Sequence, residues 1–362
     1  MAIDDRIHMS RCLELAVRGS GWVHPNPLVG CVVVREGRVV GEGYHRRFGG
    51  PHAEIVALRK AGKWARGATL YVNLEPCAHH GKTPPCVDAI IKAGIARVVS
   101  ATEDPNPLVS GRGFRKLRLS SVAVSNGIMR SEARGINERF FTFMERKIPF
   151  VGVKVAQTLD GRIADHRGVS RWITSAKARA HGHLLRSFYD AILVGASTVH
   201  RDDPLLTVRA VRGRNPIRIV LDGEFSVPVK ARMLKNSQSR SIVITSSAAL
   251  RRNKTKAMRL ERRGIDVLGI EGRGPLRAGD ILKVIAGLGI SSVLVEGGAR
   301  TIRTFLEEGL VNKMYCFVAP KILGSGLTGL DLSPRRLRSA TFLRNTKVVV
   351  LGPDLLVEGT LK

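Results

Sequence analysis

The sequence of 362 residues has no apolar run near the roughly 20 residues that a membrane-spanning helix needs. Its first residues also lack the apolar segment of a secretory signal, because the acidic Asp4 and Asp5 stand there. Only five cysteines occur, which is too few for a disulfide framework in a chain of this length. We therefore expect a cytoplasmic protein without a membrane partner, and the length favours two domains.

Acidic residues are also scarce. The chain has 30 Asp and Glu against 59 Lys and Arg, which gives a net charge of +29. The excess is spread out, with +10 in residues 1–147 and +19 in residues 148–362. Such a charge is typical of nucleic-acid binding or of a basic surface that meets phosphorylated small molecules. Because no nucleic-acid-binding motif accompanies it, we favour phosphorylated small-molecule substrates and no specific nucleic-acid partner.

The sequence alternates strand-like and helix-like segments in two successive series, which predicts an α/β sheet in each half. Pro149 separates the series, so we expect one domain over residues 1–147 and another over 148–362. In the first, residues 29–44 predict a hairpin that turns at Glu36-Gly37. A helix is expected to end at Gly62, and a single helix is expected over residues 131–147 with Ser131 as its cap.

Four residues in "PHAEIVALRK" and "EPCAHHGKTPPC" predict a catalytic metal site. His52, Cys77 and Cys86 offer one nitrogen and two sulfur ligands, which suits tetrahedral zinc with one position left for water. Glu54 lies two residues from His52 and can handle the proton of that water without binding the metal. Buried structural thiols beside a surface histidine are the alternative. The combination favours hydrolytic removal of an amino group from an aromatic ring.

The first half contains, in this order, the motifs "HPNPLVG", "GEGYH", "PHAE", "EPCAHHGKTPPC" and "EDPNPLVSGRG", with eight residues between the cysteines instead of the two of other nucleobase deaminases. In these motifs and their order it resembles the deaminase half of the bifunctional riboflavin-biosynthesis deaminase–reductase family. The resemblance implies a cytidine-deaminase-like α/β/α sandwich that deaminates a diaminopyrimidine ribosylamine 5-phosphate.

By position, the resemblance implies that His52, Cys77 and Cys86 bind zinc and that Glu54 carries protons. It also implies four substrate contacts, namely Asn26, His45, His79 and Lys82. Lys82 suits a phosphate as a point charge. We interpret His80, in the same loop, as a solvated residue.

The second half lacks G-x-G-x-x-G, and "VLVEGGAR" instead predicts a strand, a glycine pair and a helix whose N-terminus can meet a phosphate. "VKVAQTLDGRIA", "SRWIT", "HLLRS", "DAILVGASTVHRDDPLLTVR" and "LVEGGA" resemble the family's reductase half. That resemblance implies a dihydrofolate-reductase-like α/β domain in which NADPH reduces the ribosyl group to ribityl.

The resemblance also implies the reductase site residues. The cofactor contacts are Ala156, Trp172, Thr198, Asp202, Gly298, Ala299, Arg300 and Thr301. The substrate contacts are Ser170, Arg186, Leu206, Arg209 and Glu296, with the two arginines suited to grip a phosphate. Lys154 and Asp202 are catalytic candidates near the reacting ribose, or else members of a partly buried ion pair. Trp172 fits an ordinary core position equally well.

The resemblance covers residues 4–325 and implies a homo-oligomer. One departure lies at "RLSSVAV", where the family usually has a turn that contains glycine. Two other functions remain open at this point. A tRNA base deaminase would account for the charge, but it would leave the second half without a role. A zinc-stabilised structural protein would not need the carboxylate of Glu54.

Overall fold

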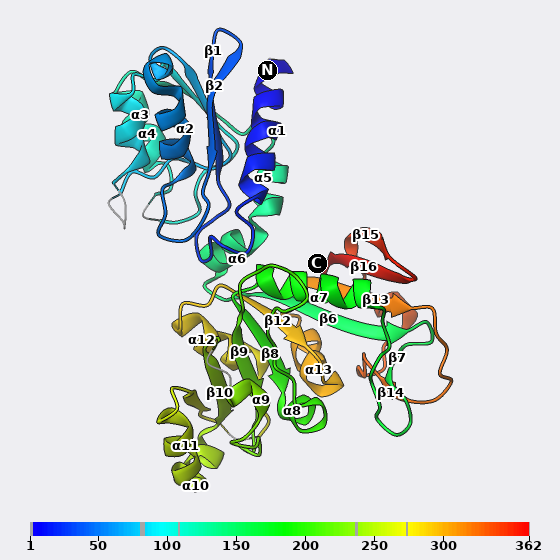
Figure 1. Cartoon of the computed structure of the whole chain (residues 1–362). Helices are drawn as coiled ribbons and strands as arrows, with labels where there is room; N and C mark the ends of the chain where they lie inside the picture. The colour runs from blue at the N-terminus through cyan, green and yellow to red at the C-terminus, as the bar shows by residue number, and fades with distance from the viewer. Residues whose placement is uncertain (1–2, 80–83, 108, 236–237, 273, 362) are drawn as a thin grey trace. The chain divides into compact units, whose positions relative to one another are not determined.

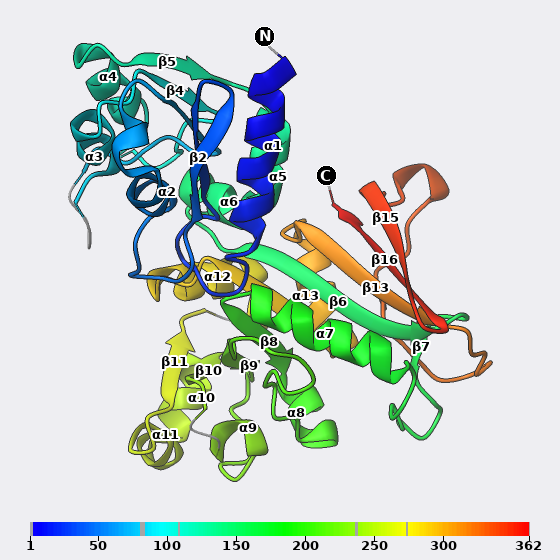
Figure 2. The ribbon, with the colours of Figure 1, turned by 45° about the horizontal axis from the view of Figure 1, so that its top comes forward.

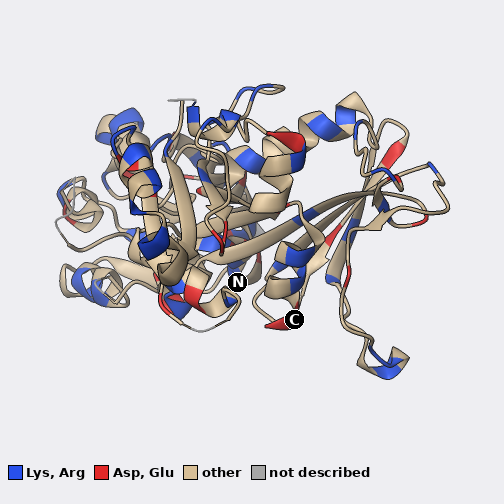
Figure 3. Cartoon of the chain, turned by 90° about the horizontal axis from the view of Figure 1, so that it is seen from below, with Lys and Arg blue, Asp and Glu red and all other residues tan. Residues whose placement is uncertain are grey.

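The computed structural model describes residues 3–79, 84–107, 109–235, 238–272 and 274–361, and it divides into two compact units, Met1–Lys147 and Ile148–Lys362 (Figure 1). None of the helices in these ranges combines the length and the apolar character that crossing a membrane requires. Lys and Arg residues occur along helices and loops of both units (Figure 3).

The first unit is a five-stranded sheet between two helical layers, in the order β2-β1-β3-β4-β5. β1 is antiparallel to β2 and β3, whereas β3, β4 and β5 are parallel. One face packs on α2, α3 and α4, and the other on α1 and α5 (Figure 1). The strands are β1 (Gly30–Arg35), β2 (Arg38–Tyr44), β3 (Thr69–Val72), β4 (Arg97–Ser100) and β5 (Ala123–Asn126). The helices are α1 (Ile3–Val17), α2 (Ala53–Ala61), α3 (Cys86–Lys92), α4 (Arg112–Leu119), α5 (Arg130–Ile136) and α6 (Glu138–Arg146), with a 3-10 turn at Gly62–Ala65.

The predicted hairpin is confirmed, because Glu36 and Gly37 join β1 to β2 with φ of 51° and 76°, as a tight hairpin turn requires. Glycines then let β2 lie against α2. A Cβ on Gly41 would fall 2.3 Å from the Ala57 carbonyl oxygen, and one on Gly43 would fall 2.6 Å from Cβ of Val56. The close contact of β2 fixes the position of α2, whose first turn carries Glu54.

The single helix predicted over residues 131–147 is wrong in two respects. The helix is broken at Asn137 into α5 and α6, and Ser131 lies inside α5, whose cap position is Met129. Asn137 has φ of −110° because its side chain binds the segment before β1: Oδ1 accepts the N–H of Leu28 at 2.7 Å, and Nδ2 donates to the Leu28 carbonyl at 2.9 Å. This tertiary contact interrupts a pattern that is locally helical.

The turn in "RLSSVAV" is retained without a glycine. Ser121, between α4 and β5, adopts φ of 61°, which is the left-handed region that glycine enters at lower cost. The departure from the family's pattern therefore changes the residue in the turn, and the described backbone still turns there.

The second unit has a nine-stranded sheet in the order β11-β10-β9-β8-β12-β6-β13-β16-β15, together with a two-stranded ribbon of β7 and β14. The strands are β6 (Phe150–Thr158), β7 (Arg162–Ala164), β8 (Ala191–Gly195), β9 (Ile217–Leu221), β10 (Ser241–Ser246), β11 (Asp266–Ile270), β12 (Ser292–Glu296), β13 (Lys313–Ala319), β14 (Leu327–Thr328), β15 (Arg344–Leu351) and β16 (Asp354–Thr360). The helices are α7 (Ala176–Phe188), α8 (Ala196–Asp202), α9 (Arg232–Lys235), α10 (Ser247–Arg252), α11 (Lys254–Glu261), α12 (Ala278–Gly287) and α13 (Ala299–Glu307), and a 3-10 turn spans Leu337–Ser339.

The strands from β11 to β13 in this sheet are parallel, and the last hairpin is antiparallel. α12 and α13 cover one face, and α7, α10 and α11 cover the other (Figure 2). β12 lies between β6 and β8, although it follows both in sequence. Ligands of such sheets bind beyond the carboxyl ends of the strands where the strand order changes, so the ends of β6, β8 and β12 are the expected location.

Candidate functional site

The three predicted metal ligands lie together in the first unit. His52 is the cap residue of α2, Cys86 is the first residue of α3, and Cys77 follows β3. The His52 Nδ1 atom lies 3.2 Å from Sγ of Cys86 and 3.6 Å from Sγ of Cys77, and all three ligand atoms lie within 4.8 Å of one another. One nitrogen and two sulfurs at these separations fit a tetrahedral zinc ion with one position left open.

The pKa values of the two thiols are shifted in opposite directions. Hydrogen bonds from Cys86 and His52 lower the pKa of Cys77 to about 4, against the effect of burial. Donation to Cys77, together with burial, raises the pKa of Cys86. Cys86 therefore holds its proton more firmly than a free thiol does, and binding a cation to both sulfurs would release that proton.

Glu54 lies beside this group without belonging to it. The side chain is in the first turn of α2, only 3% exposed, and burial raises the pKa of its carboxyl. Within the described part of the chain, its Oε2 atom has no hydrogen-bond partner. Leaving a buried carboxyl oxygen without a hydrogen bond costs folding free energy. Because this oxygen lies next to three metal ligands, we expect it to bond to a molecule that is bound at the metal site.

Two of the predicted substrate contacts are joined next to His52. Nδ2 of Asn26 donates to Nε2 of His45 at 3.2 Å, so the His45 proton lies on Nδ1, which donates to the Pro51 carbonyl at 3.0 Å. The rings of His45 and His52 have centroids 5.5 Å apart. Burial lowers the pKa of His45, which favours this neutral form.

The loop between the two cysteines is only partly described. His79 is half-buried, and its Nδ1 atom has no partner within the described residues. The predicted phosphate contact Lys82 and its neighbour His80 lie outside the described residues.

Glu75 supports this site and was missed by sequence reasoning. Its buried carboxylate accepts backbone N–H groups of Asp104, Gly111, Gly113 and Phe114 at 2.9–3.3 Å. Gly113 is required there, because a Cβ would fall 2.1 Å from the Pro76 carbonyl oxygen. The contact fixes Asp104 and residues 111–114 close to the segment that carries Cys77. A carboxylate directly before Pro-Cys is visible in sequence, but its partners lie 29 to 39 residues away.

The second unit contains two adjoining cavities of about 650 and 480 Å³. They share a wall that includes Lys154, Ala156, Ser170, Asp202 and Leu206. All the predicted reductase residues except Thr301 line at least one of them. Thr301 lies close by, with its Oγ1 3.4 Å from where a Cβ of Gly298 would be.

A buried ion pair spans the shared region. Nε and Nη2 of Arg186 each bind a carboxylate oxygen of Glu296 at 2.8 Å, and Nη1 of Arg186 donates to the Thr207 carbonyl at 3.2 Å. Nζ of Lys154 lies 3.9 Å from Glu296. Burial alone would raise the pKa of Glu296, but Arg186 and Lys154 lower it to about 2. Lys154 is therefore part of a buried ion pair, as the alternative interpretation of this residue expected. Asp202 instead accepts a hydrogen bond from the Ser170 hydroxyl at 3.5 Å.

The smaller cavity contains the glycine pair that follows β12. Gly297 and Gly298 have φ of 82° and 78°, and a Cβ on either would lie 3.3 Å from Oγ1 of Thr198. α13 begins directly afterwards, and Ala299 and Arg300 line the same cavity. Bare backbone at a helix N-terminus suits the phosphates of a dinucleotide.

The larger cavity is strongly basic. Arg209 lies there with Arg171 and Arg232, and burial together with Arg186 and these two arginines lowers the pKa of Arg209. Trp172, predicted as a cofactor contact, lines this cavity with its ring 4.1 Å from the Arg179 guanidinium carbon. It is 60% exposed, so the core alternative for Trp172 is wrong.

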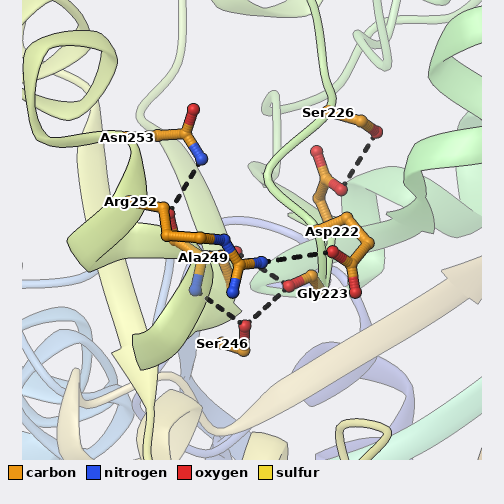
Figure 4. Close-up of polar contacts among 9 residues, drawn as sticks. Asp222, Gly223, Ser226, Ser246, Ala249, Arg252 and Asn253 are labelled. Carbon is orange, nitrogen blue, oxygen red and sulfur yellow. Dashed lines mark hydrogen bonds and ion pairs between the residues drawn. The ribbon is translucent and has the colours of Figure 1, made fainter.

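A network of polar contacts lies at the carboxyl ends of β9 and β10 (Figure 4). Oγ of Ser246 donates to the Gly223 carbonyl at 2.8 Å and accepts the N–H of Ala249, which caps α10. Asp222 accepts from Ser226 and from the N–H of Val227, and Arg252 pairs with Glu224. These contacts tie the loops that follow β9 and β10 to each other.

Comparison with known proteins gives matches over both units. Residues 149–357 match the family model described as RibD C-terminal domain, and residues 3–102 match the cytidine and deoxycytidylate deaminase zinc-binding region. The riboflavin biosynthesis protein RibD of Aquifex aeolicus is 47% identical, over 98% of this chain and 97% of the relative. That of Escherichia coli is 41% identical, over 98% of each.

Solved structures agree over the whole length. RibD of Acinetobacter baumannii aligns with a TM-score of 0.91 and 35% identity, over 99% of both chains. A Thermotoga maritima protein, named diaminohydroxyphosphoribosylaminopyrimidine deaminase/5-amino-6-(5-phosphoribosylamino)uracil reductase, aligns with a TM-score of 0.84 and 40% identity, over 99% of both. The predicted fold class, a deaminase-like α/β domain followed by a reductase α/β domain, is confirmed.

Proposed function

The chain belongs to the RibD family of riboflavin-biosynthesis enzymes, which combine a zinc-dependent deaminase with an NADPH-dependent reductase, and from this premise we propose how its residues divide the two reactions. Residues 1–147 perform the deamination and residues 148–362 the reduction. The reading as a tRNA deaminase with an unrelated second half is wrong, because that half matches the RibD C-terminal domain.

The substrate that we propose is a diaminopyrimidine ribosylamine 5-phosphate. The name of the Thermotoga maritima protein, 40% identical to this chain, supports this assignment. The product of the first reaction is then the aminouracil that the second reaction reduces at its ribosyl group.

For the deaminase, we assign zinc to His52, Cys77 and Cys86, and proton transfer to Glu54. When bound, the ion supplies the Lewis acidity that makes a water molecule nucleophilic at neutral pH. Glu54 takes a proton from that water and delivers it to the leaving amino group, so ammonia departs as a neutral molecule. The observation that carries this assignment is the buried Oε2 atom of Glu54, which lacks a protein partner among the described residues beside the ligand group.

For substrate binding in the deaminase, we assign Asn26 and His45, whose hydrogen bond fixes a neutral imidazole next to His52. His79 offers a buried nitrogen with no partner among the described residues. Lys82 remains a predicted phosphate contact outside those residues.

For the reductase, we place NADPH in the cavity of Gly298, Ala299, Arg300 and Thr198, and the pyrimidine substrate in the basic cavity. The two ligands then meet at the shared wall, where Ala156, Ser170, Asp202 and Leu206 lie. Lys154, held near Glu296, is the proposed acid for the ring oxygen of the ribose as it opens. Burial lowers the pKa of Lys154, which makes proton donation easier.

We assign the substrate phosphate to Arg209 with the neighbouring Arg171 and Arg232. Clustered guanidinium groups repel one another unless an anion neutralises them, and burial together with this repulsion lowers the pKa of Arg209. Arg186 has its donors on Glu296 and Thr207, so we assign it to hold Glu296 at the substrate. Trp172 lines the cavity that we assign to the pyrimidine substrate, and Thr301 lies beside Gly298 at the cavity that we assign to NADPH.

We further propose a cytoplasmic homo-oligomer without a specific nucleic-acid partner. Val348, Val350 and Phe342, on and before β15, are 61–73% exposed, and burial of such a strand face against a second copy would stabilise it. Sedimentation at micromolar concentration tests the oligomer, and a lack of salt-sensitive tRNA affinity tests the second statement.

The first test is NADPH oxidation by zinc-loaded protein given the diaminopyrimidine ribosylamine phosphate. We expect oxidation that falls at least about 100-fold in Glu54→Gln, while zinc content stays unchanged. Glu54→Gln given the deaminated pyrimidine should oxidise NADPH at the normal rate, which separates the two reactions. Undiminished ammonia release by this variant would remove Glu54 from the proton-transfer role.

A further inference from the structure

The cavity that we assign to NADPH has one wall made by two segments far apart in sequence. Ala164 pairs with Leu327 and Arg162 with Thr328 in the ribbon of β7 and β14. Ile163, Ala164, Leu327 and Thr328 line the cavity. A two-stranded ribbon this short is not stable by itself in water, so contacts outside the ribbon must hold the wall in place.

Asp160, in the turn between β6 and β7, supplies such contacts. Its Oδ2 atom accepts the N–H of Gly324 at 2.7 Å, and both its oxygens lie 3.2 Å from the N–H of Leu323. Its Oδ1 atom also accepts the hydroxyl of Thr158, the last residue of β6, at 2.6 Å. The Thr158 hydroxyl and these backbone amides lower the pKa of Asp160, so it stays ionised at neutral pH.

Other bonds join the same two segments. The N–H of Leu159 donates to the Lys321 carbonyl at 2.9 Å, and Nη2 of Arg162 donates to the Gly324 carbonyl at 3.0 Å. Asp160 differs from these in binding two consecutive amides just before β14. One carboxylate therefore sets where the β14 segment lies relative to the end of β6.

We propose that Asp160 is a positioning residue for NADPH, which clamps Leu323 and Gly324 to the end of β6 and so holds the β7–β14 wall against the cofactor. It acts through this wall. The inference rests on the proposed NADPH site. Without the clamp, the wall samples positions that do not contact NADPH, and the apparent affinity falls by the fraction of time spent in them.

Direct NADPH binding tests the inference, because it does not depend on turnover. NADPH fluorescence is titrated with the intact, zinc-loaded wild type, Asp160→Ala, Asp160→Asn and Glu308→Ala. Glu308 is the matched control, since its exposed carboxylate also accepts two backbone amides of a distant segment, those of Ala278 and Gly279. Hydrogen exchange over residues 321–328 reports on the clamp itself.

We expect Asp160→Ala to raise the dissociation constant of NADPH about tenfold, with a similar rise in KM and a change in kcat of less than about twofold. Asp160→Asn keeps one acceptor oxygen and should give an intermediate value. Glu308→Ala should bind NADPH as the wild type does. Exchange at Leu323 and Gly324 should become faster in the Asp160 variants alone.

Faster exchange with unchanged NADPH affinity in Asp160→Ala would overturn the inference and leave the proposed function intact. A wild type that binds no NADPH would instead refute the proposed cofactor site. Should Asp160→Ala fail to fold, Asp160→Asn carries the same comparison, and its affinity must still lie below that of Glu308→Ala.

Discussion

Glu54 and Glu296 are both buried carboxylates, but their surroundings shift their pKa values in opposite directions. Glu54 has an unpartnered oxygen among the described residues, and burial raises its pKa. Glu296 receives two bonds from Arg186 and lies near Lys154, and its pKa falls to about 2. The first is suited to exchanging protons, and the second is suited to staying ionised as a fixed negative charge.

Replacing Glu296 with Gln should destabilise the second unit by about 3 kcal/mol at pH 7, because Arg186 loses its buried counter-charge. The folded pKa of about 2 lies below the unfolded value of about 4.3. The wild type's advantage is therefore fully present above the unfolded pKa, and it is lost as the pH falls through the folded pKa. Denaturant unfolding at pH 7, 5 and 3 checks this, and an advantage that grows on acidification would contradict it.

The left-handed backbone conformation of Ser121 should lower the stability of the first unit. Because a serine at φ of 61° is less favourable than a glycine, Ser121→Gly should stabilise the first unit by about 1 kcal/mol. Thermal unfolding of the first unit checks this. Ser120→Gly is the control, since Ser120 has φ of −97° and should gain nothing from the change. A lower melting temperature for Ser121→Gly would show that the serine side chain contributes more than the backbone costs.

At the scale of elements, the contact of β2 with α2 should control metal binding. Gly43→Ala would push α2 away, because the new Cβ meets Val56 at 2.6 Å and backbone atoms at 2.8 Å. His52 is the cap residue of that helix, so we expect zinc affinity to fall at least about tenfold. Competition with a zinc chelator measures this.

Gly135→Ala is the matched control for that substitution. Gly135 lies in α5, and a Cβ there meets nothing within 4 Å. Alanine is also the better helix former, so this variant should keep zinc affinity and gain slightly in stability. Equal zinc affinity in Gly43→Ala and Gly135→Ala would show that the close contact does not position His52.

The features that the sequence could predict are those coded within one element or one short motif. The Glu36-Gly37 hairpin, the end of α2 at Gly62, and the HAE and cysteine segments depend on neighbours in sequence. Glu75, Asn137 and Asp160 could not be assigned, because each acts on backbone groups 29 to 164 residues away. α12 was overlooked, although its buried residues follow helical spacing, namely Ala278, Ile281, Leu282 and Ile285.

The same reason explains why the ion pair of Arg186 was not predicted. A lone arginine in "HLLRS" suggests a phosphate clamp, and only the sheet brings Glu296 to it from 110 residues away. Arg186 lines both cavities, and its partner Glu296 could not be read from spacing.

At the scale of the whole molecule, each unit has its own hydrophobic cores. Removing zinc should therefore abolish deamination and leave NADPH-dependent reduction of the deaminated pyrimidine unchanged. Both rates are measured after dialysis against a chelator, and again after zinc is restored. Loss of reduction on chelation, with recovery on adding zinc, would show that the two units depend on one another.

The two units lie on one polypeptide of 362 residues, so every copy that is synthesised adds one site of each kind. The rate that forms the intermediate and the rate that consumes it are both proportional to the concentration of this one protein. At a given concentration of the first substrate, the steady-state concentration of the intermediate therefore does not depend on how much protein is present. A cell can raise or lower expression of this chain without accumulating the deaminated pyrimidine. Separate genes would need matched expression to achieve the same balance.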